Sequence, residues 1–158
     1  MAVNEATYDR LIDKALALGD GVAAMTATGY SVVDGSTGQL NLGTLDRMES
    51  DLVIDVSACD VAQGDESYKF RLVGSNDATP FGTNIIVLAT AEFGDNTTIG
   101  PAIPVTTADR GVGRYIIPCE NVGFLAGVRT AFKNIRLHVT IAGTSPSITF
   151  KAWLAKRG

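Results

Sequence analysis

The feature that most constrains this chain is a two-residue periodicity of apolar side chains in two neighbouring segments. Residues 134–142 and 147–156 both place an apolar side chain at every second position. Successive side chains of a β-strand point to opposite faces of its sheet, so both segments are predicted to be strands with one buried face. The intervening residues 143–146, Gly-Thr-Ser-Pro, are typical of a hairpin-type loop.

Shorter segments elsewhere in the chain carry the same kind of signal. Val, Ile and Thr, the β-branched residues that favour strands, account for 14 + 11 + 16 = 41 of the 158 residues, and 17 glycines separate them into short runs. Further strands are predicted at 30–33, 39–42, 51–57, 68–74, 85–93, 99–105 and 113–119. About eight or nine strands in one domain predict an all-β fold, as either a two-sheet β-sandwich or a closed barrel.

One helix is predicted, over residues 5–18, because its apolar side chains recur at spacings of three and four. Asn4 caps its start and Gly19 its end. A helix of this length is marginal alone, so it packs either on its own domain or on a partner chain. We therefore divide the chain into an N-terminal helix and arm, residues 1–28, and a β-sandwich domain, residues 29–158. The apolar positions that make the helix a candidate interface with a partner chain are Tyr8, Leu11, Ile12 and Leu16.

The charges are distributed unevenly along a chain whose net charge is −4. Residues 1–120 hold all 17 acids and 7 bases, whereas residues 121–158 hold 6 bases and no acid. Such a segment forms either a solvated basic face or a surface that docks on an acidic protein partner. Six bases without interleaved surface aromatics are weak support for nucleic-acid binding, and we expect none. The candidate interface residues here are Arg136, Lys151, Trp153, Lys156 and Arg157, with Trp153 predicted to face outward.

Residue types that carry out catalysis or hold metals are scarce. His138 is the only histidine, and it falls on the polar face of a predicted strand, where neighbouring cations would lower its basicity. Cys59 and Cys119 are 60 residues apart, and no cluster suggests a zinc site. The acids of residues 46–66 offer carboxylate pairs for a hydrolase, but without a defined separation. We expect a non-enzymatic protein with no catalytic residues, no metal site and no cofactor.

The compartment follows from what the sequence lacks. The first 20 residues carry Glu5, Asp9 and Asp13, where a secretory signal would have positive charge and then an apolar run. The longest apolar run, residues 85–89, is far shorter than the roughly 20 residues of a membrane helix. We expect synthesis in the cytoplasm, no membrane partner, and two cysteines that remain thiols.

The order of several short motifs resembles a known family. The segments that carry the resemblance are Asp13–Asp20, the Ala/Thr-rich Ala23–Thr28, Val32–Asp34, Phe70–Asp77 and Asn134–Val139. In this order they are similar to the jelly-roll cement (decoration) proteins of tailed double-stranded-DNA phages. Their Val-x-Asp-Leu-Gly element is less regular here, and the loop at Ala78–Asn84 is particular to this chain.

The resemblance implies a non-enzymatic structural protein of the virion with a jelly-roll sandwich. Such a protein binds the outer surface of the capsid, bridges major capsid subunits and associates with itself as a dimer or trimer. The expected location is therefore the capsid exterior, after synthesis in the host cytoplasm. The alternative is a carbohydrate-binding β-sandwich module, which would need exposed aromatic side chains such as Trp153.

Overall fold

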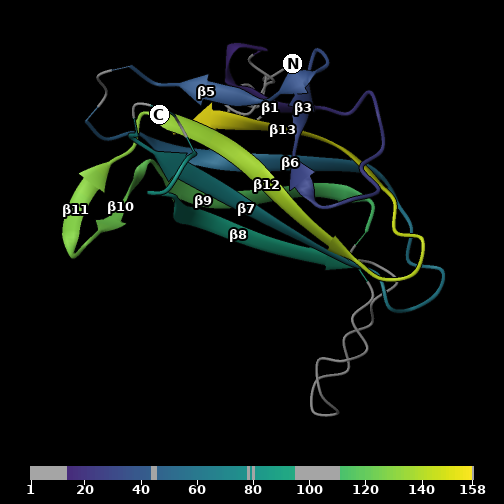
Figure 1. Cartoon of the computed structure of the whole chain (residues 1–158). Helices are drawn as coiled ribbons and strands as arrows, with labels where there is room; N and C mark the ends of the chain where they lie inside the picture. The colour runs from purple at the N-terminus through teal and green to yellow at the C-terminus, as the bar shows by residue number, and fades with distance from the viewer. Residues whose placement is uncertain (1–13, 44–45, 78, 80, 95–110, 158) are drawn as a thin grey trace, which may run out of the picture.

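The computed structural model describes residues 14–43, 46–77, 79, 81–94 and 111–157. Two antiparallel β-sheets packed face to face form the body of the molecule (Figure 1). Sheet A has the order β1 (Ala17–Asp20), β13 (Ile148–Lys156), β6 (Glu49–Cys59) and β9 (Gly113–Glu120). Sheet B has the order β2 (Gly29–Tyr30), β12 (Asn134–Ala142), β7 (Ser67–Ser75) and β8 (Ile86–Gly94), and β5 (Gln39–Asn41) also pairs with β12. The all-β prediction is confirmed.

Two small hairpins complete the described elements. The pair β3 (Val32–Val33) and β4 (Ser36–Thr37) lies near β1. The pair β10 (Val122–Leu125) and β11 (Val128–Ala131) follows β9 and stands apart from the two main sheets (Figure 1).

The long strands pass repeatedly between the two sheets. In chain order β1 lies in sheet A, β2 and β5 in sheet B, β6 in A, β7 and β8 in B, β9 in A, β12 in B and β13 in A. As a result β1, the first strand, pairs with β13, the last. Each sheet therefore combines strands from distant parts of the sequence.

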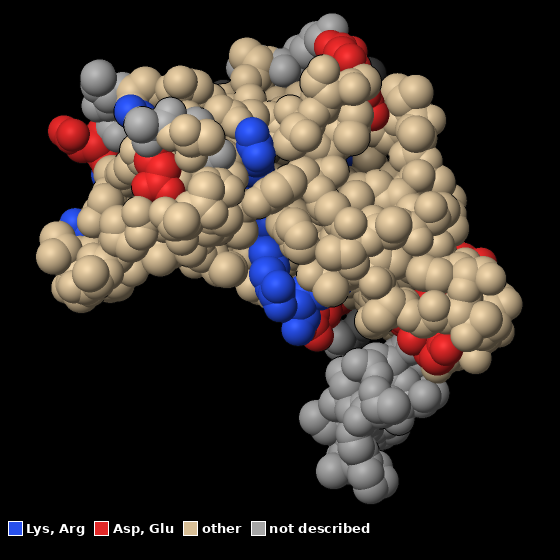
Figure 2. Space-filling model, in the orientation of Figure 1, with Lys and Arg blue, Asp and Glu red and all other residues tan. Residues whose placement is uncertain are grey.

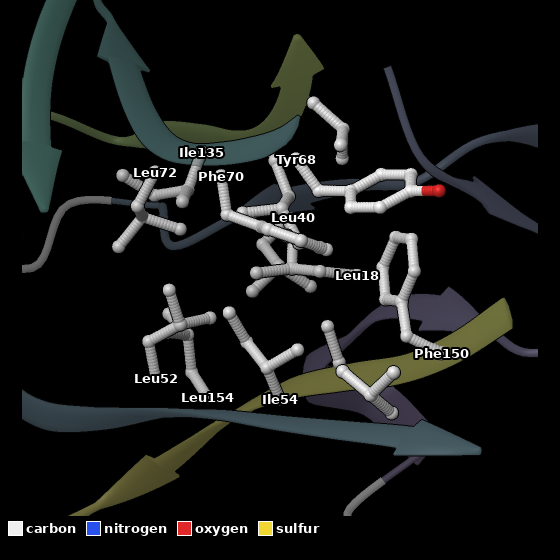
Figure 3. Close-up of a cluster of buried hydrophobic side chains, with 14 of the residues drawn as sticks. Leu18, Leu40, Leu52, Ile54, Tyr68, Phe70, Leu72, Ile135, Phe150 and Leu154 are labelled. Carbon is white, nitrogen blue, oxygen red and sulfur yellow. The ribbon is translucent and has the colours of Figure 1, made fainter. Parts of the chain in front are cut away.

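The core lies between the sheets and is built by the alternation that the sequence predicts. Figure 3 shows the side chains of Leu52, Ile54 and Leu154 from sheet A pointing towards Phe70 and Ile135 from sheet B. All five are buried. At roughly 1.5–3 kcal/mol for each large apolar side chain removed from water, this layer is the main stabilising term of the fold.

The predicted helix over residues 5–18 is wrong at its C-terminal end. Lys14–Leu16 form a single 3-10 turn, and Ala17–Asp20 form strand β1. Residues 5–13 of the prediction lie outside the described residues. Leu18 is fully buried in the core and β1 pairs with β13, so packing and strand pairing override the helical spacing. Strand β1, which falls within the predicted N-terminal segment of residues 1–28, is part of sheet A.

The prediction that Trp153 is exposed is also wrong. Trp153 does lie on the outer face of sheet A, because its neighbours Ala152 and Leu154 face the main core. Its side chain is only 1% exposed and forms a second buried cluster with Val53 and Ala155. Alternation predicts which face a residue takes, but it does not predict whether that face is covered.

Candidate functional site

The outer face of sheet B carries a line of cationic side chains. On β12 the inward residues alternate with Arg136 and His138, and on β7 they alternate with Lys69 and Arg71. The register places His138 directly beside Arg71. Figure 2, which views this side of the molecule, shows a line of Lys and Arg down the middle of this side, with uncharged surface to its left and right and acidic atoms at its lower end. We call the surface formed by Tyr30, Lys69, Arg71, Phe81, Arg136 and His138 the Arg136 face.

Two aromatic rings hold the guanidinium group of Arg136 in place. Its Cζ lies 4.3 Å from the ring centroid of Phe81 and 5.1 Å from that of Tyr30. The Arg136 Nε atom donates a hydrogen bond to Gln39 Oε1 at 2.9 Å. Tyr30 also packs edge-on against His138, with centroids 5.2 Å apart. Stacking and hydrogen bonding fix the Arg136 side chain, so it loses less conformational freedom when it binds a partner.

Phe81 reaches this face from a loop that Asp77 organises. The Asp77 carboxylate accepts hydrogen bonds from the backbone N–H of Thr83 at 3.2 Å and of Asn84 at 2.9 Å, and from the Asn84 side chain. The bonds from Asn84 are the main reason that the pKa of Asp77 is lowered. Phe81 itself adopts φ 65°, a left-handed conformation that bulky residues rarely take. Local strain of this kind is characteristic of functional loops.

The cations of the Arg136 face are only partly neutralised. Lys69 forms an ion pair with Glu92. Arg71 and Arg136 form no ion pair with any carboxylate in the part of the chain that the structure describes. Burial, and then the positive charge of Arg71, lower the pKa of His138, which favours the uncharged form of this histidine. The expected decrease in its basicity is confirmed in direction, with burial as the larger cause.

The sequence-predicted interface residues do not form one surface. Arg136 lies on the outer face of sheet B, whereas Lys151 is exposed on sheet A. Leu16 is half-buried and packs against the main core. Arg157 forms an ion pair with Asp51 at 2.8 Å. Trp153 is buried, as described above, and therefore cannot stack on a sugar. Tyr8, Leu11, Ile12 and the side chain of Lys156 lie outside the described residues.

The aromatic members of the Arg136 face are not evident from the sequence. Tyr30 falls in a predicted strand, but the sequence does not predict which strand it pairs with. The structure pairs Tyr30 with His138 of β12, and this pairing places its ring on the Arg136 face. No sequence signal identifies Phe81, because a loop residue has no periodicity and this loop is particular to the chain. The rings that stack on Arg136 belong to Tyr30 and Phe81, which lie outside the base-rich segment of residues 121–158.

Cys59 and Cys119 are free thiols, as predicted. Burial raises the pKa of Cys59 to about 11 and also raises that of Cys119. The β6–β9 register places Cys119 opposite Ser50, which lies nine residues from Cys59 along β6. At roughly 3.3 Å per residue the two cysteines are about 30 Å apart, far beyond the reach of a disulfide.

Within the described ranges, no group of three or more His, Cys, Asp or Glu side chains is arranged to hold a metal ion. No helix among the same residues is long and apolar enough to cross a membrane. Comparisons with protein-family models, with curated proteins and with solved structures find no match to this chain. No relative therefore supplies a function for the Arg136 face.

Proposed function

We propose that this chain is a capsid cement protein of a tailed double-stranded-DNA phage, which docks on the outer capsid surface through the Arg136 face. In this role it bridges major capsid subunits and associates with itself. The docking surface is proposed on the basis of two cations, Arg136 stacked on Phe81 and Arg71 beside His138, that form no ion pair with a carboxylate among the described residues. A fixed guanidinium group is well suited to bind carboxylates on an acidic protein surface.

The winding of the chain supports the proposed jelly-roll form of the sandwich. The orders β1-β13-β6-β9 and β2-β12-β7-β8, with most successive strands crossing between the sheets, are what a jelly roll of two Greek keys would require. Together with the sequence resemblance, this winding favours the cement-protein proposal. Many symmetry-related copies bind one shell, and their weak individual contacts together hold the protein firmly on the capsid.

The proposal is tested by binding the purified chain to expanded and to precursor shells of the phage that encodes it. We expect cosedimentation with expanded shells only. Arg136→Glu should weaken binding about tenfold or more, with the larger effect at low salt, where charges are less screened. Lys151→Glu makes the same charge change on sheet A and serves as the matched control, with binding unchanged.

The outcomes separate the parts of the proposal. If the wild-type chain does not bind expanded shells, the cement function is excluded. If Lys151→Glu weakens binding while Arg136→Glu does not, the docking surface lies on sheet A and the Arg136 face is excluded. Equal free energies of unfolding for the two variants establish that lost binding is not lost folding.

A further inference from the structure

The β10–β11 hairpin projects from one end of the molecule (Figure 1). Its turn residues Ala126 and Gly127 both have positive φ, 49° and 80°, as in the tight turns that suit two-stranded hairpins. Gly123 lies so close to the body that a Cβ there would be 2.9 Å from Ile86 Cγ2. That side of the ribbon therefore faces the body, and the opposite side faces away from it.

Phe124 and Arg129 lie on the side of the hairpin that faces away from the body. They are cross-strand partners, so their side chains stand next to each other. Phe124 is 67% exposed, a large apolar surface to leave in contact with water. Arg129 approaches Glu120 only to 3.9 Å, which makes a weak ion pair. The hairpin thus presents a phenyl ring next to a cation.

An apolar pocket of about 200 Å³ lies between β1, β3 and the start of β13. Glycines and alanines make up much of its lining, and Met25 and Phe150 also line it. Val22, which is 84% exposed, and Val32 bring it to the molecular surface. A cavity of ~150 Å³ is enough to hold benzene, so this pocket has room for one phenyl ring.

The hairpin of one copy cannot fill the pocket of the same copy. The register of β6 pairs Glu49 with Glu120, just before the hairpin, and pairs Val56 with Phe150, which lines the pocket. These two positions on β6 are seven residues apart, or roughly 23 Å. The projecting hairpin adds to that separation (Figure 1). A contact between them must therefore join two copies of the chain.

The charges at the two places are complementary. Asp20 lines the pocket. Its Oδ2 atom accepts a hydrogen bond of 2.9 Å from the backbone N–H of Asp34. Lys151 also lies at the pocket, with its stem against Gly21. The wall of the pocket thus carries the carboxylate of Asp20, and the hairpin carries Arg129 and no acid.

We propose that Phe124 of one copy inserts into this pocket of a second copy, with Arg129 facing Asp20. Half of the exposed large apolar side chains among the described residues, Val22, Val32, Phe124 and Val128, lie at these two places, and the contact would cover them. Such a contact closes as a reciprocal dimer or as a ring. It uses neither the Arg136 face nor a shell, so it goes beyond the proposed docking and can fail independently of it.

The first test is the oligomeric state of the purified chain, measured by light scattering and sedimentation over the micromolar range. We expect a dimer or a small ring. Phe124→Ser should weaken this association about 30-fold or more, the scale of a residue that dominates an interface. Val112→Ser, at another exposed valine, is the control and should leave association unchanged. A wild-type monomer, or an assembly that Phe124→Ser leaves intact, would overturn the proposal.

The second test identifies which surfaces meet. Val128→Cys, on the hairpin with Phe124 retained, and Val22→Cys chains are mixed and treated with a short thiol cross-linker, with the wild type as the background control for Cys59 and Cys119. The proposal requires a cross-linked pair that contains one chain of each variant. A pair formed by Val128→Cys alone would show a hairpin-to-hairpin contact and would exclude the pocket.

Discussion

At the scale of single residues, the burial of Trp153 leads to a prediction about stability. Trp153→Ala should lower the free energy of unfolding by about 3–5 kcal/mol, because it empties a closed apolar cluster. Trp153→Phe should cost roughly half of that or less, because it also removes a buried indole N–H that has no hydrogen-bond partner. Trp153 is the only tryptophan, so unfolding in urea is followed by far-UV circular dichroism. Equal losses for both variants would contradict this account.

Residue-level features divide into those that periodicity can predict and those that it cannot. The outward positions of Arg136 and His138 follow directly from the alternation along their strand. The burial of Trp153 and the stacking of Phe81 on Arg136 depend on segments distant in sequence. Local pattern therefore predicts half of the candidate site, its cations, and tertiary packing supplies the aromatic rings.

At the scale of elements, the lack of a side chain at Gly74 allows the segment that carries Phe132 to pack closely against β7. A Cβ at Gly74 would lie 2.7 Å from Cβ of the fully buried Phe132. Gly74→Ala should therefore destabilise the fold by about 1–3 kcal/mol through overpacking. Gly29→Ala, in β2 of the same sheet, meets nothing within 4 Å and is the matched control. Similar unfolding midpoints in urea for these two variants would refute the prediction.

Strand prediction succeeded where a strand has one continuous buried face. The six longest strands, β6 to β9, β12 and β13, lie within about two residues of their predicted bounds. The predicted strand at residues 99–105 lies outside the described residues. The β10–β11 hairpin was missed because Phe124 and Val128 are exposed apolar residues that break the alternation. Strand β1 was missed because its four residues are too few to outweigh the helical spacing before them.

At the scale of the whole molecule, sheet packing rather than covalent cross-linking holds the fold together. The two free thiols are about 30 Å apart along β6, so no intramolecular disulfide contributes to stability. Adding dithiothreitol should leave the urea midpoint of the purified chain unchanged. Because burial raises the pKa of both thiols, their reaction with Ellman's reagent at pH 7.5 should be slow until urea unfolds the chain. A reductant-dependent midpoint would contradict this prediction.

The pairing of β1 with β13 has a consequence for the order of events during translation. Within sheet A, β1 pairs with β13, and β6 pairs with β9 and β13. Each of these early strands can pair only after a later strand has been synthesised. Until β13 has emerged, sheet A is incomplete, and the core around Leu52 and Ile54 of β6 cannot close. The nascent chain therefore exposes aggregation-prone apolar strands for most of its synthesis, and chaperones that shield such strands should raise the yield of folded protein.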